Sequence, residues 1–119
     1  MGEVKDRLKE FIECPGALVA VLSGEIDQYG AAYLRSKIDV ETELSGKKNL
    51  VLDLSEVSFM DSAGIGLIIG RAKNLSPIGG RVALAGAGKK LKKILELGGV
   101  MRLCPLYPNY RKAVEDLMK

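Results

Sequence analysis

Apolar residues in this chain occur in short blocks separated by glycine, proline or charged residues. Two such blocks flank Pro15-Gly16, a pair typical of a tight turn, and predict a hairpin with strands near 9–14 and over 17–23. Helical spacing fits the first block nearly as well, with apolar residues at Val4, Leu8, Phe11 and Ile12. Whether residues 1–11 join the sheet or lie outside it therefore stays open.

Four later segments carry apolar residues at helical spacing. They cover residues 29–44, 62–75, 89–97 and 110–118, and Gly46 suits the end of the first. The predicted inward residues are Ala31, Leu34, Ile38, Val40 and Leu44 in the first, Ile65, Ile68, Ile69, Ala72 and Leu75 in the second, and Ala113, Val114 and Leu117 in the last.

Short apolar runs between these helices predict strands at 49–54, 81–85 and 101–104. The 49–54 run has almost no polar interior position, which is typical of a central parallel strand covered on both faces. Residues 24–27 interrupt the pattern, and residues 55–60 are expected to form a connector. The alternation of strands and helices predicts an α/β fold in which about four helices pack on a mixed, mostly parallel sheet of four or five strands. We expect residues 1–119 to form a single domain.

Composition narrows the class of protein. Hydrophobic residues make up 47% of the 119 residues and charged residues 28%, as expected of a globular chain with a real core. No run reaches the roughly 18 apolar residues that a membrane-spanning helix needs. The N-terminus is charged from its third residue, unlike a secretory signal. We therefore expect a cytoplasmic protein without a membrane span.

The net charge of +3 is too modest to indicate nucleic-acid binding by itself. One basic cluster contains Lys89, Lys90, Lys92 and Lys93, but no aromatic residue lies among them and aromatic residues are only 5% of the chain. Single-stranded nucleic acid is usually bound by basic grooves with stacking aromatics. A solvated helix face is the better interpretation, with no direct contact to nucleic acid.

The chain contains no histidine, which removes the commonest general base, the commonest metal ligand and the Ser–His–Asp triad. Two glycine-rich segments resemble nucleotide motifs imperfectly. The third glycine after Gly64 and Gly66 comes one residue late, and the segment ending at Lys90 lacks the first glycine and the Ser or Thr of a P-loop. We expect no catalytic residue, metal or cofactor, although a nucleotide-binding module using Gly64–Gly66 and Gly86–Lys89 remains an alternative.

Residues 58–66 are the strongest candidate for a functional site. The plain interpretation is that Asp61 or Ser62 caps a helix, which contributes about 1 kcal/mol. The first turn nevertheless contains Ala63, Gly64 and Gly66, and each helical glycine costs about 1 kcal/mol relative to alanine. That cost is explained if another backbone or a phosphate group must approach closely.

Together, several motifs resemble the STAS domain over essentially the whole chain. They are the turn Gly24-Glu25-Ile26-Asp27, the strand Val51-Leu52-Asp53-Leu54, the segment Phe59-Met60-Asp61-Ser62-Ala63-Gly64-Ile65-Gly66 and the pair Gly79-Gly80. Within that family the chain is most similar to the bacterial anti-sigma factor antagonists.

The resemblance implies a partner-switching cycle. The unphosphorylated antagonist would bind an anti-sigma factor that is also a serine kinase, and so release a sigma factor. ATP-dependent phosphorylation of Ser62 would end that binding, and a serine phosphatase would restore it. Ala63 replaces the second serine of some family members, so Ser62 is the sole hydroxyl there. The implied docking surface consists of Asp27, Asp61, Ser62, Ala63, Gly64, Ile65 and Gly66.

The resemblance also implies a chain that is a monomer when free. An alternative within the same fold is a STAS-type module with a different partner, such as a stress-sensing or a lipid-transport complex, because a fold does not determine a function.

Overall fold

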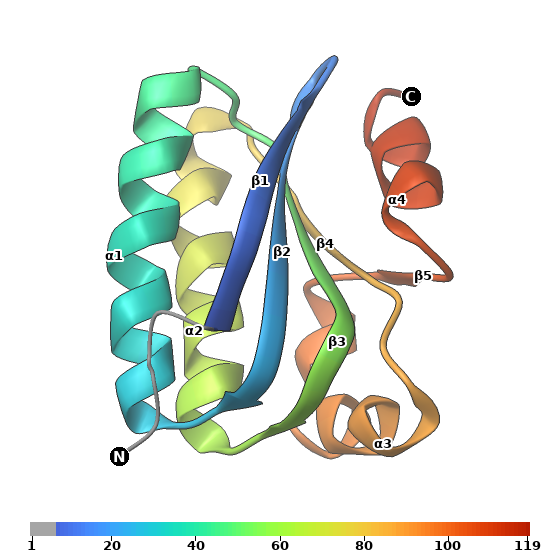
Figure 1. Ribbon diagram of the computed structural model, residues 1–119. Helices are drawn as coiled ribbons and strands as arrows, with labels where there is room; N and C mark the ends of the chain where they lie inside the picture. Colours follow the sequence, from blue (N-terminus) through green and yellow to red (C-terminus); the bar gives the residue numbers. More distant parts are fainter. Residues whose placement is uncertain (1–6) are drawn as a thin grey trace.

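A five-stranded sheet with the order β1-β2-β3-β4-β5 organises residues 7–119, the part of the chain that the computed structural model describes (Figure 1). β1 (Leu8–Cys14) and β2 (Ala17–Ile26) form the predicted antiparallel hairpin around Gly16, whose φ is 81°. β3 (Leu50–Met60), β4 (Val82–Ala85) and β5 (Leu106–Tyr107) continue the sheet in parallel. The predicted mixed, mostly parallel α/β fold is confirmed.

The structure answers only for part of residues 1–11 whether they join the sheet. Residues 1–6, including Val4, lie outside the described residues. From Leu8 onward the chain is a strand paired with β2, so the helical interpretation of this stretch is wrong.

Helices cover both faces of the sheet (Figure 1). On one face α1 (Gln28–Ser45), α2 (Ser62–Leu75) and α3 (Lys89–Leu97) contribute to one apolar core. On the other face α4 (Tyr110–Leu117) packs against the small residues of β2 to β4. Two short 3₁₀ helices, η2 (Ser76–Ile78) and η3 (Val100–Arg102), follow α2 and α3. None of the helices between residues 7 and 119 combines the length and the apolar character needed to cross a membrane.

The centre of the sheet is buried from both sides, as predicted for its middle strand. All residues from Leu50 to Leu54 on β3 are buried, and Leu52 has no exposed surface. The lysines of α3 are exposed whereas its Leu91 and Leu95 are buried, which agrees with the solvated-face interpretation.

The expected connector at 55–60 is wrong, because β3 and β2 both run further than predicted. β2 continues through 24–26, and β3 continues to Met60. Over this stretch the register shifts twice, and β3 uses two more residues than β2 does. Such bulges break the period-2 alternation of side chains. The pattern that was interpreted as a loop is therefore a bulged strand.

The predicted strand at 101–104 is also wrong. The chain forms the 3₁₀ turn η3 there, and the last strand is the two-residue β5. Val100 and Cys104 are both fully buried and point into the core one helical turn apart. Their apolar character reflects the packing of a turn rather than a strand.

Two helix faces also differ from the prediction. Val40 and Leu44 on α1 are 56% and 76% exposed, because no element of the described chain covers that side. On α2, Leu67 and Arg71 are buried and were not predicted, while Ile65, Ile69 and Ala72 are only half-buried.

We expect Leu52→Ala to destabilise the chain by about 2–5 kcal/mol, because it leaves a cavity in the central strand. Val40→Ala removes an apolar side chain of similar type from an exposed helix face, and should change the free energy of unfolding by less than about 0.5 kcal/mol. Urea unfolding followed by circular dichroism measures both. Equal losses for the two variants would contradict this assignment of the core.

Candidate functional site

The carboxyl ends of β2 and β3 meet at one edge of the sheet. Ile26 lies opposite Met60, and the Asp61 N–H donates to the Ile26 carbonyl at 3.3 Å. Ile26 and Met60 are almost completely buried. Because the paired strands are parallel and end together, the helices that follow them begin side by side at this edge (Figure 1).

Each of these helices begins with an aspartate cap. Asp27 Oδ1 accepts from the Gly30 N–H at 2.9 Å at the start of α1, and Asp61 Oδ1 accepts from the Ala63 N–H at 2.8 Å at the start of α2. Such caps satisfy amide groups that have no partner within the helix. The question left open between Asp61 and Ser62 is thus answered, because Asp61 is the cap.

Ser62 is consequently free for another role. It is the first residue of α2 and is exposed, and its hydroxyl has no hydrogen bond to any residue in the described part of the chain. The unpaired amides and the dipole at the start of a helix favour negative charge there. The geometry presents an accessible hydroxyl where an added phosphate would be tolerated.

The two glycines in the first turn of α2, Gly64 and Gly66, have different structural surroundings. A Cβ at Gly64 would lie 2.7 Å from Met60 Cβ and 3.2 Å from the Ile26 carbonyl oxygen. Gly64 therefore lets α2 start directly against the ends of both strands, so here a backbone, not a phosphate, makes the close approach. A Cβ at Gly66 would meet nothing within 4 Å, and the residue is exposed.

Exposed apolar side chains occur on the elements that meet at this end of the sheet. Tyr29 at the start of α1 is 70% exposed and Phe59 near the end of β3 is 41% exposed. Ile65 on α2 is half-buried against Gly98, and the neighbouring Leu97 is 90% exposed. Neither Tyr29 nor Leu97 belongs to the site predicted from the sequence. Tyr29 lies two residues after the Asp27 cap, and this position could have indicated it from the sequence.

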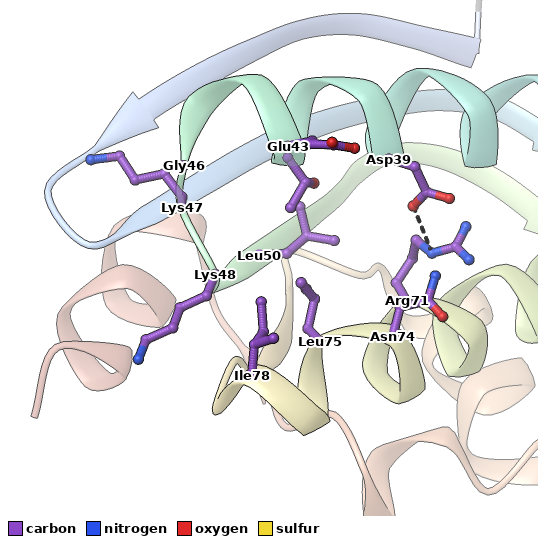
Figure 2. Close-up of a pocket in the computed structure, with 11 residues that line it drawn as sticks. Asp39, Glu43, Gly46, Lys47, Lys48, Leu50, Arg71, Asn74, Leu75 and Ile78 are labelled. Atoms are coloured by element: carbon purple, nitrogen blue, oxygen red, sulfur yellow. Dashed lines mark ion pairs between the residues drawn. The ribbon is translucent and has the colours of Figure 1, made fainter.

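A separate cavity lies toward the other ends of the same two helices. It has a volume of about 550 Å³ and its wall carries charges of both signs, including Asp39, Glu43, Lys47 and Lys48 (Figure 2). The side chain of Arg71 lies at one end of this cavity, with Nε 3.2 Å from Asp39 Oδ1. The cavity is separated from Ser62 by the length of α2.

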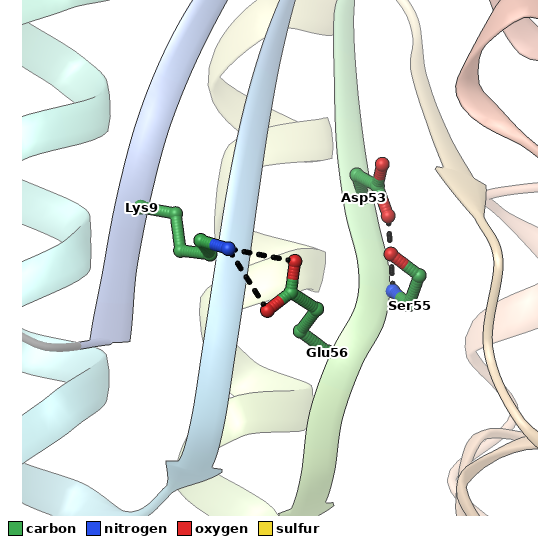
Figure 3. Close-up of polar contacts among 4 residues, drawn as sticks. All are labelled: Lys9, Asp53, Ser55 and Glu56. Carbon is green, nitrogen blue, oxygen red and sulfur yellow. Dashed lines mark hydrogen bonds and ion pairs between the residues drawn. The ribbon is translucent and has the colours of Figure 1, made fainter.

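The second glycine-rich segment does not form a phosphate cradle. Asp53 is 8% exposed and accepts from the Ser55 N–H at 2.9 Å (Figure 3). Gly86 packs against both, since a Cβ there would lie 3.0 Å from Ser55 Cβ and 3.4 Å from Asp53 Oδ1. A carboxylate beside the turn opposes the binding of a phosphate, which weakens the nucleotide alternative.

Figure 3 also shows an ion pair that links β1 to the extended part of β3. Lys9 Nζ on β1 donates to both carboxylate oxygens of Glu56 at 3.0 and 3.1 Å, across the intervening β2. Both side chains are about half exposed, so the pair contributes little to stability.

Comparison with known proteins gives a consistent answer. The family model described as the STAS domain matches residues 9–113. The anti-sigma F factor antagonist of Paenibacillus polymyxa is 31% identical over 86% of this chain and 87% of its own length. The crystal structure of an anti-sigma factor antagonist from Mycobacterium paratuberculosis superposes with a TM-score of 0.82 at 26% identity, covering 96% of this chain and 97% of that one.

A further structural neighbour is SpoIIAA, the Bacillus cell fate determinant, whose structure is known in unphosphorylated and phosphorylated forms. Its unphosphorylated form has a TM-score of 0.68 and 24% identity, covering 93% of this chain and 96% of that one. At this identity the similarity supports the shared fold.

Gly64→Ala is expected to destabilise the chain by about 1–3 kcal/mol, because the new Cβ overlaps Met60 and the Ile26 carbonyl. The matched control Gly66→Ala has open space around its Cβ and should stabilise α2 by up to about 1 kcal/mol. Chemical unfolding of both variants measures the difference. If Gly64→Ala were as stable as Gly66→Ala, the close approach of α2 to the strand ends would be contradicted.

Proposed function

Because this chain belongs to the STAS domain family, we propose that it is an anti-sigma factor antagonist that acts by phosphorylation-controlled partner switching. Residues 1–119 would act as a single STAS domain in the cytoplasm. Its unphosphorylated form binds an anti-sigma factor that is also a serine kinase, and a sigma factor is released. The chain itself catalyses no reaction in this cycle.

The observation that carries the proposal is the exposed hydroxyl of Ser62 at the first residue of α2. In the kinase reaction the Ser62 oxygen forms a bond to the γ-phosphorus of ATP as the bond to ADP breaks, and the hydroxyl proton passes to a base of the kinase. A serine phosphatase later hydrolyses the phosphate ester. Since Asp61 already caps the helix, Ser62 can be modified without loss of the cap.

The switch follows from electrostatics. A phosphoserine adds about −1.5 to −2 charges beside Asp61. One like-charge contact at about 4 Å, between this phosphate and an acidic group of the kinase that faces Ser62, costs roughly 4 kcal/mol at an effective dielectric constant of 20, which corresponds to about a thousandfold in affinity. Meanwhile the helix N-terminus stabilises the phosphate within this chain. The partner is therefore repelled while the fold persists.

The proposed docking surface surrounds Ser62 at the shared edge of β2 and β3. Asp27 and Asp61 supply its acidic positions and the first turn of α2 supplies Ala63, Gly64, Ile65 and Gly66. Gly64 acts indirectly, because it is buried and positions the turn. Tyr29 and Leu97 add exposed apolar surface of the kind that anchors protein interfaces.

We expect the cognate anti-sigma factor kinase and ATP to phosphorylate this chain on Ser62 alone, as mapped by mass spectrometry. Ser62→Asp should weaken binding to the kinase by about two to three orders of magnitude, whereas Ser62→Ala should retain it. Isothermal titration calorimetry measures both affinities.

The matched control is Ser76→Asp, which places the same charge on an exposed serine at the other end of α2. Its affinity should equal that of the parent chain. Phosphate on another residue, or equal losses for Ser62→Asp and Ser76→Asp, would rule out the proposed switch.

Asp61→Asn separates the two roles of the cap. Asparagine caps a helix about as well as aspartate, so the free energy of unfolding should change by less than about 0.5 kcal/mol. In the proposed complex Asp61 faces a basic group of the kinase, apart from the acidic group that faces Ser62, so the lost charge should nevertheless weaken binding to the kinase by about fivefold or more. Asp61→Ala should lose the same affinity and also about 1 kcal/mol of stability. Parent-like affinity of Asp61→Asn would show that Asp61 acts only as a cap.

A further inference from the structure

Arg71 is a charged residue on the inward side of α2, and the site described above does not use it. It is 5% exposed, and its Nε lies 3.2 Å from Oδ1 of the half-exposed Asp39 on α1. Nε is thus ion-paired with Asp39, although not in hydrogen-bond geometry, whereas the buried Nη1 makes no hydrogen bond within residues 7–119. A buried donor without an acceptor is rare and costly in native proteins, so Nη1 calls for an explanation.

Arg71 lines a groove that leads toward Ser62. The groove has a volume of about 270 Å³ and lies between α1 and α2, and its lining extends along α2 from Ala63 to Arg71. Figure 2 shows the guanidinium of Arg71 extending past Asp39, away from Lys47 and Lys48. A second arginine, Arg35, also lines the groove, and no aspartate or glutamate does.

Two glycines keep this groove open. A Cβ at Gly66 or at Gly70 would meet nothing within 4 Å, so packing within the described chain requires glycine at neither position. Both residues line the groove one helical turn apart on α2. Glycine lowers helix stability compared with alanine, and these two positions bear that cost without the steric reason that applies to Gly64.

The electrostatics of the groove favour a negative ligand. Burial lowers the pKa of the Arg71 guanidinium, the Asp39 carboxylate opposes this shift, and the positive charge of Arg35 adds to it. The positive charges of Arg35 and Arg71 thus repel each other, and both residues line a groove that Asp39 does not line. A carboxylate between them would relieve the repulsion and supply an acceptor for forked N–H donors.

We propose that the groove between α1 and α2 receives an acidic side chain of the same anti-sigma factor kinase that docks at Ser62, and that Arg35 and Arg71 bind its carboxylate. This inference rests on the proposed function and extends it by assigning the chemistry of one partner residue.

The shape of the groove favours a protein side chain over a free small molecule. Its volume lies below the roughly 300–1,000 Å³ that is usual for ligand pockets, and no aromatic side chain lines it to hold a base or ring. Its lining includes Ala63, the neighbour of Ser62, so a partner that covers Ser62 can also reach the groove. The small residues of α2 allow a partner segment to approach the helix closely.

The test measures the affinity of the full chain for its cognate kinase by calorimetry. Arg35→Ala, Arg71→Lys and Gly70→Leu should each weaken binding by about tenfold or more, because they remove a charge, remove the guanidinium fork or fill the groove. Arg111→Ala is the matched control, since it removes an exposed arginine from α4 on the other face of the sheet and should change affinity by less than about twofold.

Stability is measured alongside, since Arg71 is buried. Gly70→Leu replaces a poor helix former by a good one, so its melting temperature should not fall below that of the parent chain. A loss of affinity in this variant cannot then be attributed to unfolding. Higher salt should reduce the effect of Arg35→Ala more than that of Arg71→Lys, because Arg35 is exposed and Arg71 is buried.

The partner's contribution is tested by charge exchange. Arg35→Glu should abolish binding, and an acid-to-lysine change at one position of the kinase should restore it. If Ser62→Asp abolishes binding and all three groove variants bind like the parent chain, the groove assignment is overturned and the proposed function stands. Binding that Ser62→Asp leaves intact contradicts the proposed function instead, and no binding by the parent chain contradicts both.

A separate arm addresses free anions. The ¹H–¹⁵N signal of Arg71 Nε should not shift when sodium acetate or inorganic phosphate is added alone up to millimolar concentrations, and should shift when the kinase is added. A saturable shift with acetate or phosphate that disappears in Arg35→Ala would identify a small-anion site and overturn the assignment to the partner.

Discussion

The parallel pairing of β2 and β3 extends to their last residues, where Ile26 lies opposite Met60. This register brings the two aspartate caps to the same edge of the sheet and starts α1 and α2 side by side. Gly64 completes the arrangement, because any larger residue there would push α2 away from both strand ends. The position of Ser62 on the surface is therefore a consequence of backbone pairing in the sheet, and a change in that pairing would move every residue of the site together.

This dependence explains how the proposed charge switch at Ser62 can operate on a rigid scaffold. The parts that position Ser62 are buried strand ends and a satisfied cap, and none of them involves the Ser62 hydroxyl. A phosphate on that hydroxyl changes the potential of the surface and leaves these contacts in place. The negative charge of the phosphate thus weakens binding to the partner and does not destabilise the fold.

Much of this architecture could be predicted from the sequence, because most helices and central strands have clear periodicity and matching end signals. The segment 55–60 was misread because two bulges remove the alternation that identifies a strand. Val40 was misplaced because helical spacing shows which residues share a face, but not whether another element covers that face. Ser62 was placed in a functional site by its motif. Arg71 was missed although it lies between Ile68 and Leu75 at inward spacing. The role of a charged residue on an apolar helix face cannot be inferred until the groups packed around it are known.

Ser62 and Arg71 lie on the same helix, but the two proposals give them contacts with different groups of the partner. Nine residues separate Ser62 from Arg71, which corresponds to about 13 Å along the helix axis. At that separation two unit charges interact about a third as strongly as at 4 Å for the same dielectric constant. A phosphate at Ser62 therefore acts mainly on the partner near the start of α2 and leaves Arg71, further along the groove, largely unneutralised. Under the two proposals, the strength of the switch and the choice of partner are determined at separate places, so a substitution in the groove can change which kinase is bound without altering the response to phosphorylation.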